Sequence, residues 1–197
     1  MDESVVRAIA KWPNVPSVYG WLSLDRRGQW LIKGERIANP LVSAFINRNY
    51  ESDLEGRWYF QNGPQRVYVR LEYTPYVHVV DRRDDELALA THTGLQATQV
   101  REALIDETGA LVLRTDVGVG VVSDRDLAAI AELVVMDTGE PADEASLAEL
   151  ASGTPGRRLH LMYGPRRVLI AAAVSHELPG RFAYLQEPRP APGEPEC

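Results

Sequence analysis

Apolar and polar residues alternate with a period of two along much of the chain. The clearest example is the segment 65–73, where one series of alternate residues is apolar and the other is mostly polar: Val67, Val69, Leu71 and Tyr73 against Arg66, Tyr68, Arg70 and Glu72. Such alternation is typical of a strand that packs one face on a core. Further strands are predicted at 18–24, 29–33, 57–61, 76–80, 87–91, 100–105, 110–122, 158–163, 166–174 and 182–186.

Helical periodicity is restricted to four short segments, at 4–12, 39–49, 123–134 and 144–151. In the second of these, Asn39 suits the N-cap position and Pro40 suits the first helical position. In the third, Ser123 and Asp126 resemble a capping box. These signals predict helices that begin at those residues.

The pattern as a whole predicts an α+β protein built from repeated β-hairpin units, with a few short helices and two β-rich halves. The charged run 81–86 marks a boundary between an N-terminal β-rich domain at 1–82, with one helix packed on hairpins, and a C-terminal α+β domain at 83–186. Residues 187–197 are rich in Pro and Glu, which predicts a disordered tail.

Three segments, beginning at Gly28, Gly56 and Gly156, share one order of elements. Each has a glycine turn, a strand, a second glycine turn and a returning strand. In two of them the second turn is Gly-Pro and is followed closely by Arg-Val, which favours duplication of a structural unit. The alternative is that any β-hairpin tends to have glycine at its turns.

Several short motifs resemble, in their order and spacing, those of an uncharacterised proteobacterial family of unknown function. That family runs through Asp-Gly-x-Trp, Gly-x-x-Ile, Leu-Val-x-x-Phe, Val-x-Lys-Val-x-Ile and Glu-Asp-Ala-Pro-Phe-Val. The resemblance covers roughly residues 17–122. It is carried by the segments Asp25–Trp30, Gly34–Ile37, Leu41–Phe45, Gln65–Val69, Glu72–Val77 and Leu113–Gly118.

The resemblance implies a duplicated core and a second domain with a pleckstrin-homology-like sheet. It also implies a ligand site between the two domains for a nucleotide-type molecule, and a signalling role. The sequence departs from the family at Glu72-Tyr73-Thr74-Pro75-Tyr76, and the region after Val122 does not match it. These departures indicate a sister family.

Composition excludes several classes of function. The 197 residues are 45% hydrophobic and 25% charged, which is ordinary for a globular protein, and their net charge of −7 argues against nucleic-acid binding. The single cysteine is Cys197, so no internal disulfide forms. The chain has no secretory signal and no apolar run approaching ~18 residues, so it is expected to be cytoplasmic and free of the membrane.

No motif in the chain points to catalysis or to a cofactor. There is no Gly-x-Ser-x-Gly elbow and no phosphate-binding Gly-x-x-x-x-Gly-Lys loop. The four histidines do not have metal-ligand spacing. The segment Gly118–Ser123 lacks the third glycine of a dinucleotide fingerprint and is better explained as a strand. We therefore expect a non-enzymatic protein with no metal or cofactor.

Arginines on the predicted strands are the best indication of a binding site. Planar guanidinium groups beside aromatic rings suit the recognition of phosphate or carboxylate. The candidates for ligand binding are Arg66, Tyr68, Arg70, Arg114 and Trp30, and Arg166 and Arg167 have similar strand positions. The alternatives are a solvated sheet face with ordinary ion pairs and, for the aromatic residues, a place in the core.

Two functions fit these features ahead of a third, an enzyme whose base and nucleophile only folding would bring together. The first is a binding or signalling module that holds a small anionic, nucleotide-like ligand at the junction of two domains. The second is a structural or partner-binding protein that uses exposed hairpin edges, and homo-oligomers are compatible with it.

Overall fold

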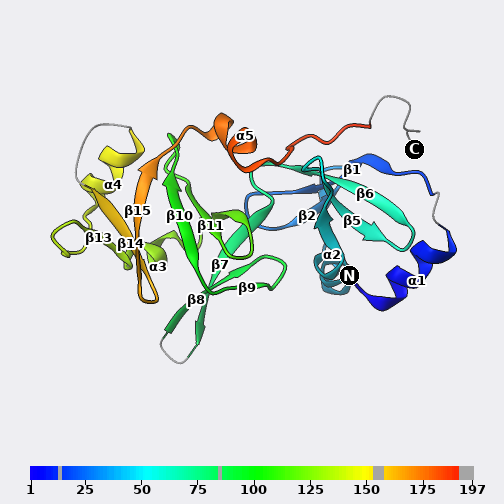
Figure 1. Cartoon of the computed structure of the whole chain (residues 1–197), viewed down its shortest axis with the longest axis horizontal. Helices are drawn as coiled ribbons and strands as arrows, with labels where there is room; N and C mark the ends of the chain where they lie inside the picture. The colour runs from blue at the N-terminus through cyan, green and yellow to red at the C-terminus, as the bar shows by residue number, and fades with distance from the viewer. Residues whose placement is uncertain (13–14, 84–85, 153–157, 191–197) are drawn as a thin grey trace. The chain divides into compact units, whose positions relative to one another are not determined.

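The chain forms two compact units, which are described one at a time below. The computed structural model describes residues 1–12, 15–83, 86–152 and 158–190 (Figure 1). The first unit comprises Met1–Pro75 and Phe182–Cys197, and the second comprises Tyr76–Arg181. The boundary differs from the one expected at 82/83, because the strand β7 (Tyr76–Arg83) pairs along its length within the second unit.

A six-stranded sheet forms the centre of the first unit. Its strand order is β3-β2-β1-β6-β5-β4, and all neighbours are antiparallel except β1 and β6. The strands are β1 (Val18–Leu24), β2 (Trp30–Ile32), β3 (Glu35–Arg36), β4 (Tyr50–Ser52), β5 (Trp58–Asn62) and β6 (Gln65–Leu71). The predicted alternation of β6 is confirmed on its apolar side, because Val69 and Leu71 are buried.

The helices of this unit are α1 (Glu3–Lys11) and α2 (Pro40–Arg48). The predicted start of α2 is confirmed, since the side chain of Asn39 accepts a hydrogen bond from the backbone N–H of Leu41 at 2.9 Å. Phe45 of α2 meets Phe60 of β5 edge to face, with ring centroids 5.4 Å apart. This contact packs α2 on the sheet face formed by the apolar series.

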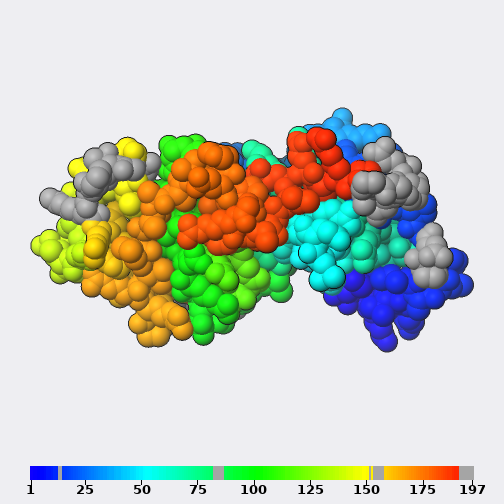
Figure 2. Space-filling view, turned by 45° about the horizontal axis from the view of Figure 1, so that its top comes forward, coloured from blue at the N-terminus to red at the C-terminus, as the bar shows by residue number. Residues whose placement is uncertain are grey.

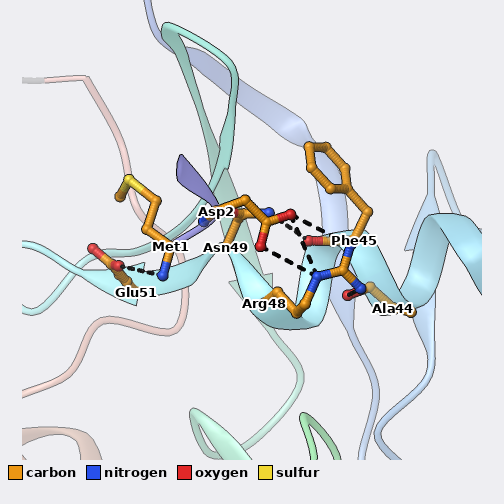
Figure 3. A network of polar contacts seen from close by, with 7 residues as sticks. All are labelled: Met1, Asp2, Ala44, Phe45, Arg48, Asn49 and Glu51. Carbon is orange, nitrogen blue, oxygen red and sulfur yellow. Dashed lines mark hydrogen bonds and ion pairs between the residues drawn. The ribbon is translucent and has the colours of Figure 1, made fainter. Parts of the chain in front are cut away.

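Polar contacts tie the start of α1 to the end of α2 (Figure 3). The backbone N–H of Asp2 donates to Oδ1 of the buried Asn49 at 2.7 Å, and the Asn49 side chain donates to the carbonyl of Phe45. Arg48 Nε donates to the Asp2 carboxylate at 3.2 Å. Asn49 thus satisfies backbone groups at two helix ends, which have no intrahelical partner.

The strand predicted at 182–186 is wrong. Residues Leu178–Phe182 form the short helix α5, and Pro179 in its first turn suits a helix start. The following residues make two backbone hydrogen bonds in the first unit, Leu71 N–H to Gln186 O and Leu185 N–H to Gly56 O, rather than a ladder. Of the tail predicted at 187–197, residues 191–197 lie outside the described ranges.

The second unit contains a nine-stranded sheet in the order β13-β14-β15-β10-β11-β12-β7-β8-β9. Its remaining strands are β8 (Glu86–Thr91), β9 (Gln96–Ala97), β10 (Val100–Ile105), β11 (Leu111–Thr115), β12 (Val119–Val122), β13 (Val134–Met136), β14 (Leu159–Tyr163) and β15 (Arg166–Ala172). The pairs β10–β15 and β12–β7 are parallel, and the others are antiparallel.

Helices α3 (Leu127–Ala131) and α4 (Glu144–Ala151) cover the core face of this sheet. Ile130 of α3, with Leu147 and Leu150 of α4, packs on a cluster that includes Leu113, Leu159, Leu161 and Ile170. Because side chains alternate along a strand, the residues between these core positions on β10 and β15 face the other way. That opposite face is where the candidate site lies.

The capping box predicted at Ser123 and Asp126 is not formed. Asp126 makes no cap to α3, and its carboxylate accepts a hydrogen bond from the Val80 backbone N–H at 3.2 Å. The preference of the segment Gly118–Ser123 for a strand is confirmed by β12. A Cβ on Gly120 would lie 2.9 Å from the ring of His78, so glycine lets the imidazole pack against the strand.

The α+β class and the two β-rich halves are therefore confirmed. The duplication of hairpin units and the pleckstrin-homology-like character of the second half stay predictions. Within the ranges that the structure describes, no helix is both long and apolar enough to cross a membrane.

Candidate functional site

A groove of about 410 Å³ lies over strands β10 and β15 of the second unit. The β14–β15 hairpin that borders it reaches the surface, where its residues are orange in the space-filling view (Figure 2). The lining contains four arginines, one glutamate and a set of apolar residues: Arg101, Arg166, Arg167, Arg181, Glu102, Val100, Ala103, Leu104, Val168, Leu169 and Ala171. We call it the arginine groove.

The groove exists because β10 and β15 pair over only part of their length. Their parallel register joins Ala103–Ile105 to Ile170–Ala172. In the described structure, no register pair joins the earlier residues of the two strands, whereas β15 pairs with β14 from Arg166 onward. The two strands therefore form a fork whose open end carries the first residues of each.

Arg101 lines the groove from a β-bulge in β10. On the side of β11, Val100 is paired with Thr115 and Glu102 with Arg114, so Arg101 is the extra residue of β10. A bulge redirects a side chain relative to the regular alternation. Arg166 is the first residue of β15, directly after the Gly164-Pro165 turn of the hairpin.

Two acidic residues at the groove, Glu102 in its lining and Asp137 beside it, are already paired with arginines, and Arg167 Nη2 is 3.5 Å from Asp137 Oδ1. Glu102 accepts a hydrogen bond from Arg114 at 2.7 Å and another from Arg181 at 2.8 Å. The Arg114 guanidinium, followed by burial in the opposite sense and by Arg181, leaves the pKa of the Glu102 carboxyl below its usual range. One carboxylate thus faces two guanidinium groups, and positive charge remains in excess.

The other arginines of the groove differ in their partners. Arg167 Nη2 donates to the carbonyl oxygens of Met136 and Asp137, at 3.1 and 3.0 Å. Within the part of the chain that the structure describes, the guanidinium groups of Arg101 and Arg166 make neither a hydrogen bond nor an ion pair. Both side chains are in exposed residues, so they are available to an anion from solvent.

The predicted residues Arg66 and Tyr68 lie in the first unit. The Arg66 guanidinium is 4.7 Å from the centre of the Tyr59 ring, on the sheet face opposite α2. Tyr68 is only 1% exposed and stacks on Tyr19 with ring centroids 4.5 Å apart. The structure therefore brings Arg66 and Tyr68 into one aromatic group in which the Tyr68 ring is covered.

Sequence reasoning missed the pair that organises this group, Asp53 and Arg57. Arg57 Nε donates to Asp53 Oδ2 at 2.7 Å, and the two side chains are 13% and 9% exposed. The hydroxyl of Tyr68 also donates to Asp53, at 3.1 Å. Burial raises the pKa of the Asp53 carboxyl, but these hydrogen bonds outweigh it and hold that pKa below its usual value.

Trp30 and Arg70 are also in the first unit, and neither is part of a positively charged pocket of the described structure. Trp30 is 2% exposed, and its indole N–H donates to Asn47 at 2.7 Å, which matches the alternative of a core residue. Arg70 lines a pocket of about 380 Å³ together with three acidic residues, Asp25, Glu72 and Glu187. That acidic lining opposes the binding of an anion.

Arg114 belongs to the second unit, where it pairs with Glu102 beside the arginine groove. Arg166 and Arg167, which their strand positions had suggested, line the groove themselves. Arg101 and Arg181 were missed, and only the strand register and a contact between residues distant in sequence reveal them. In the described residues, no group of three or more His, Cys, Asp and Glu side chains could hold a metal ion.

Comparison with known proteins places the chain in a family without an assigned function. The profile of a family described as "Protein of unknown function (DUF2946)" matches residues 1–189, and the chain belongs to this family. No curated protein matches the sequence. The expectation of an uncharacterised family is therefore confirmed.

Two solved structures are similar to this chain. One is a DUF1285 family protein from Silicibacter pomeroyi DSS-3, with 17% identity, a TM-score of 0.55 and coverage of 86% of this chain and 88% of that one. The other is a DUF1285 family protein from Shewanella baltica OS155, with 15% identity, a TM-score of 0.39 and coverage of 55% and 88%. The first similarity shows a shared fold.

Proposed function

We propose that the protein is a non-enzymatic binding module that takes a small anionic ligand into the arginine groove of its second unit. The observation that carries the proposal is that Arg101 and Arg166 both line one groove and, in the described structure, have no partner of their own. Guanidinium groups form strong charge-assisted hydrogen bonds with phosphate and carboxylate oxygens.

The charge of the groove stands out against that of the whole molecule. The chain has a net charge of −7, whereas the groove lining has four arginines and one glutamate. Like charges gathered in one place repel each other and are tolerated most easily where an anion joins them. A volume of about 410 Å³ falls within the range of small-molecule sites.

The proposal is tested by titrating isotope-labelled protein with inorganic phosphate and with AMP at low ionic strength while amide chemical shifts are followed. We expect shifts centred on β10 and β15. Replacing a residue that makes charged hydrogen bonds costs about 1.5–3 kcal/mol, so Arg101→Ala and Arg166→Ala should each weaken binding roughly 10- to 100-fold.

Arg125→Ala is the matched control, because Arg125 is an exposed arginine of the same unit that does not line the groove. Its affinity should equal that of the wild type. Equal binding by the wild type and by both groove variants would disprove the proposal, as would the absence of any shift with every anion. Ligand-dependent signalling in the cytoplasm is the role that such a module would serve.

Partner binding is a second candidate function, and a surface of the first unit favours it. An apolar groove of about 370 Å³ runs beside α2, and Trp21, Ile32 and Val42 in its lining are 49%, 46% and 40% exposed. Exposed apolar patches often mark protein interfaces. Sedimentation of the wild type and of Trp21→Ser across a concentration series tests self-association, which the variant should weaken.

A further inference from the structure

We propose that the anion bound in the arginine groove is amphiphilic, with its charged head at Arg101 and Arg166 and an aliphatic body along Leu104, Leu169 and Ala171. This inference rests on the proposed function and narrows the class of ligand. It follows from three features of the groove. Its charged and apolar residues lie at different positions along the strands, its floor is the apolar surface of Leu104 and Leu169, and its lining, among the residues that the structure describes, has no aromatic, amide or hydroxyl side chain.

The direction comes from the parallel pairing of β10 and β15. In a parallel pair the first residues of both strands lie at the same end, so Arg101 and Arg166 are at one end of the groove. Leu104 and Ala171 are register partners further along the same two strands. From the Arg101–Arg166 end toward Leu104 and Ala171, the unpartnered arginines give way to apolar side chains and to Arg181, which is already bonded to Glu102. This arrangement suits a molecule with one charged end.

The floor offers apolar surface that the fold leaves uncovered. Leu169 is 49% exposed, although a leucine on a central strand usually packs against other side chains. Leu104, on the neighbouring strand, is 2% exposed and forms the packed base of the groove. Aliphatic groups laid on this surface would leave water, and each buried methylene strengthens binding about fourfold.

The described lining lacks the aromatic, amide and hydroxyl side chains that commonly hold a nucleobase. Among the described residues that form the groove there is no aromatic ring, no amide side chain and no hydroxyl side chain. Proteins that bind bases stack them on aromatic rings and satisfy their edges with hydrogen-bonding groups. The groove has only aliphatic side chains and charged ones, so an alkyl body fits it better than a base.

Four probes separate these possibilities: inorganic phosphate, hexyl phosphate, hexanoate and AMP. We expect hexyl phosphate to bind at least tenfold more tightly than inorganic phosphate and more tightly than AMP in the same amide-shift titration. Hexanoate shows whether a carboxylate serves as the head as well as a phosphate does. The affinity of either alkyl anion should fall at least tenfold in Arg101→Ala.

The variant Leu169→Asn tests the floor directly. It should bind hexyl phosphate and inorganic phosphate with nearly equal affinity, because the apolar surface is lost while the arginines remain. Leu95→Asn is the control, since Leu95 lies in the same unit at 48% exposure and does not line the groove. That control should keep the preference for the alkyl anion.

The outcomes distinguish failure of this inference from failure of the proposed function. Equal affinity of the wild type for inorganic and hexyl phosphate, or tighter binding of AMP, overturns the amphiphilic class while anion binding stands. A preference for hexyl phosphate that survives in Leu169→Asn overturns the assignment of the floor. If none of the four anions binds, the proposed function itself is disproved.

Discussion

Two pairs of arginines, Arg57 and Arg66 in the first unit and Arg101 and Arg166 in the second, are used in opposite ways. In the first unit, Arg57 pairs with Asp53 and lies 4.8 Å from the centre of the Tyr68 ring, and Arg66 lies over Tyr59. Each of these guanidinium groups has a partner supplied by the fold. In the second unit, the described structure supplies no partner to Arg101 or Arg166, although they share one groove.

The difference shows that an arginine on a strand is not by itself a sign of a binding site. Arg57 and Arg66 stabilise the sheet face on which the aromatic rings lie, and their loss should affect folding. The unpartnered arginines of the second unit contribute little to the folded state, and their loss should affect binding. The comparison can therefore be tested by measuring stability and affinity separately for each unit.

Removal of Arg57 should have the largest effect. Arg57→Ala would leave the Asp53 carboxylate, which is 9% exposed, without its cation, and removing one partner of a buried ion pair costs about 3–5 kcal/mol. All four tryptophans lie in the first unit, so tryptophan fluorescence during urea unfolding reports that unit alone. Arg57→Lys keeps the charge and should lose clearly less stability than Arg57→Ala.

A loss below 1 kcal/mol in Arg57→Ala would show that the Asp53–Arg57 pair is not a structural centre of the first unit. In that case Arg57 would not be a stabilising arginine, and the contrast with Arg101 and Arg166 would be wrong. The double variant with Asp53→Asn separates the pair from other effects, because removing both charges should cost less than the sum of the two single changes.

The second prediction concerns His78, which lies in the core of the unit that carries the open arginines. It is fully buried, and burial lowers the pKa of its imidazole to about 4 from the ordinary 6.5, against a hydrogen bond with the Leu113 carbonyl. The folded pKa is depressed, so the unfolded chain takes up a proton first as the pH falls below about 6.5. Protonation of His78 in the unfolded chain should by itself lower stability by about 3 kcal/mol between pH 7 and pH 4.

The pH effect of His78 is measured by hydrogen exchange of amides in β10 and β11 at the two pH values. His78→Gln retains a donor for the Leu113 carbonyl but has no titrating group, and it should show a smaller loss of stability over this range. His92, whose pKa burial lowers to about 3, remains in the variant and accounts for part of the residual slope. An unchanged slope in His78→Gln would contradict the assignment.

Much of the fold could be predicted from local patterns, because strands and caps depend on neighbouring residues. The alternation in Gln65–Leu71 and the cap at Asn39 are local signals, and both are present in the structure. The segment 182–186 is a short run of apolar and aromatic residues, which suggests a strand, but such a run does not decide whether a partner strand lies next to it. In the structure two single backbone hydrogen bonds hold that segment, and no ladder forms.

The candidate site was predicted in part, for a similar reason. The doublet Arg166-Arg167 at the start of a strand could be found in the sequence, and it lines the groove. Arg101 could not be predicted, because it lies in the bulge of β10, and the bulge is recognised only when the register with β11 is known. Arg181 reaches Glu102 across a sequence separation of 79 residues, and no local pattern encodes such a contact.

Removal of Arg66 should have a modest effect. Its guanidinium lies over the face of Tyr59, and such a cation–π contact at a partly exposed site contributes about 0.5–1 kcal/mol. Arg66→Ala should lower the stability of the first unit by that amount in urea unfolding, whereas Arg66→Lys should retain part of it. A loss as large as that of Arg57→Ala would place Arg66 among the residues that hold the sheet face together.

The smallest expected effect on stability is that of the groove arginines. Arg101→Ala and Arg166→Ala remove no hydrogen bond or ion pair of the described structure, so the free energy of unfolding of the second unit should change by less than about 0.5 kcal/mol. Relief of repulsion within the groove could even make the change slightly favourable. Hydrogen exchange of β10 and β15 without any anion measures it. A loss above 1 kcal/mol would mean that these arginines serve the fold, and the contrast with the first unit would then disappear.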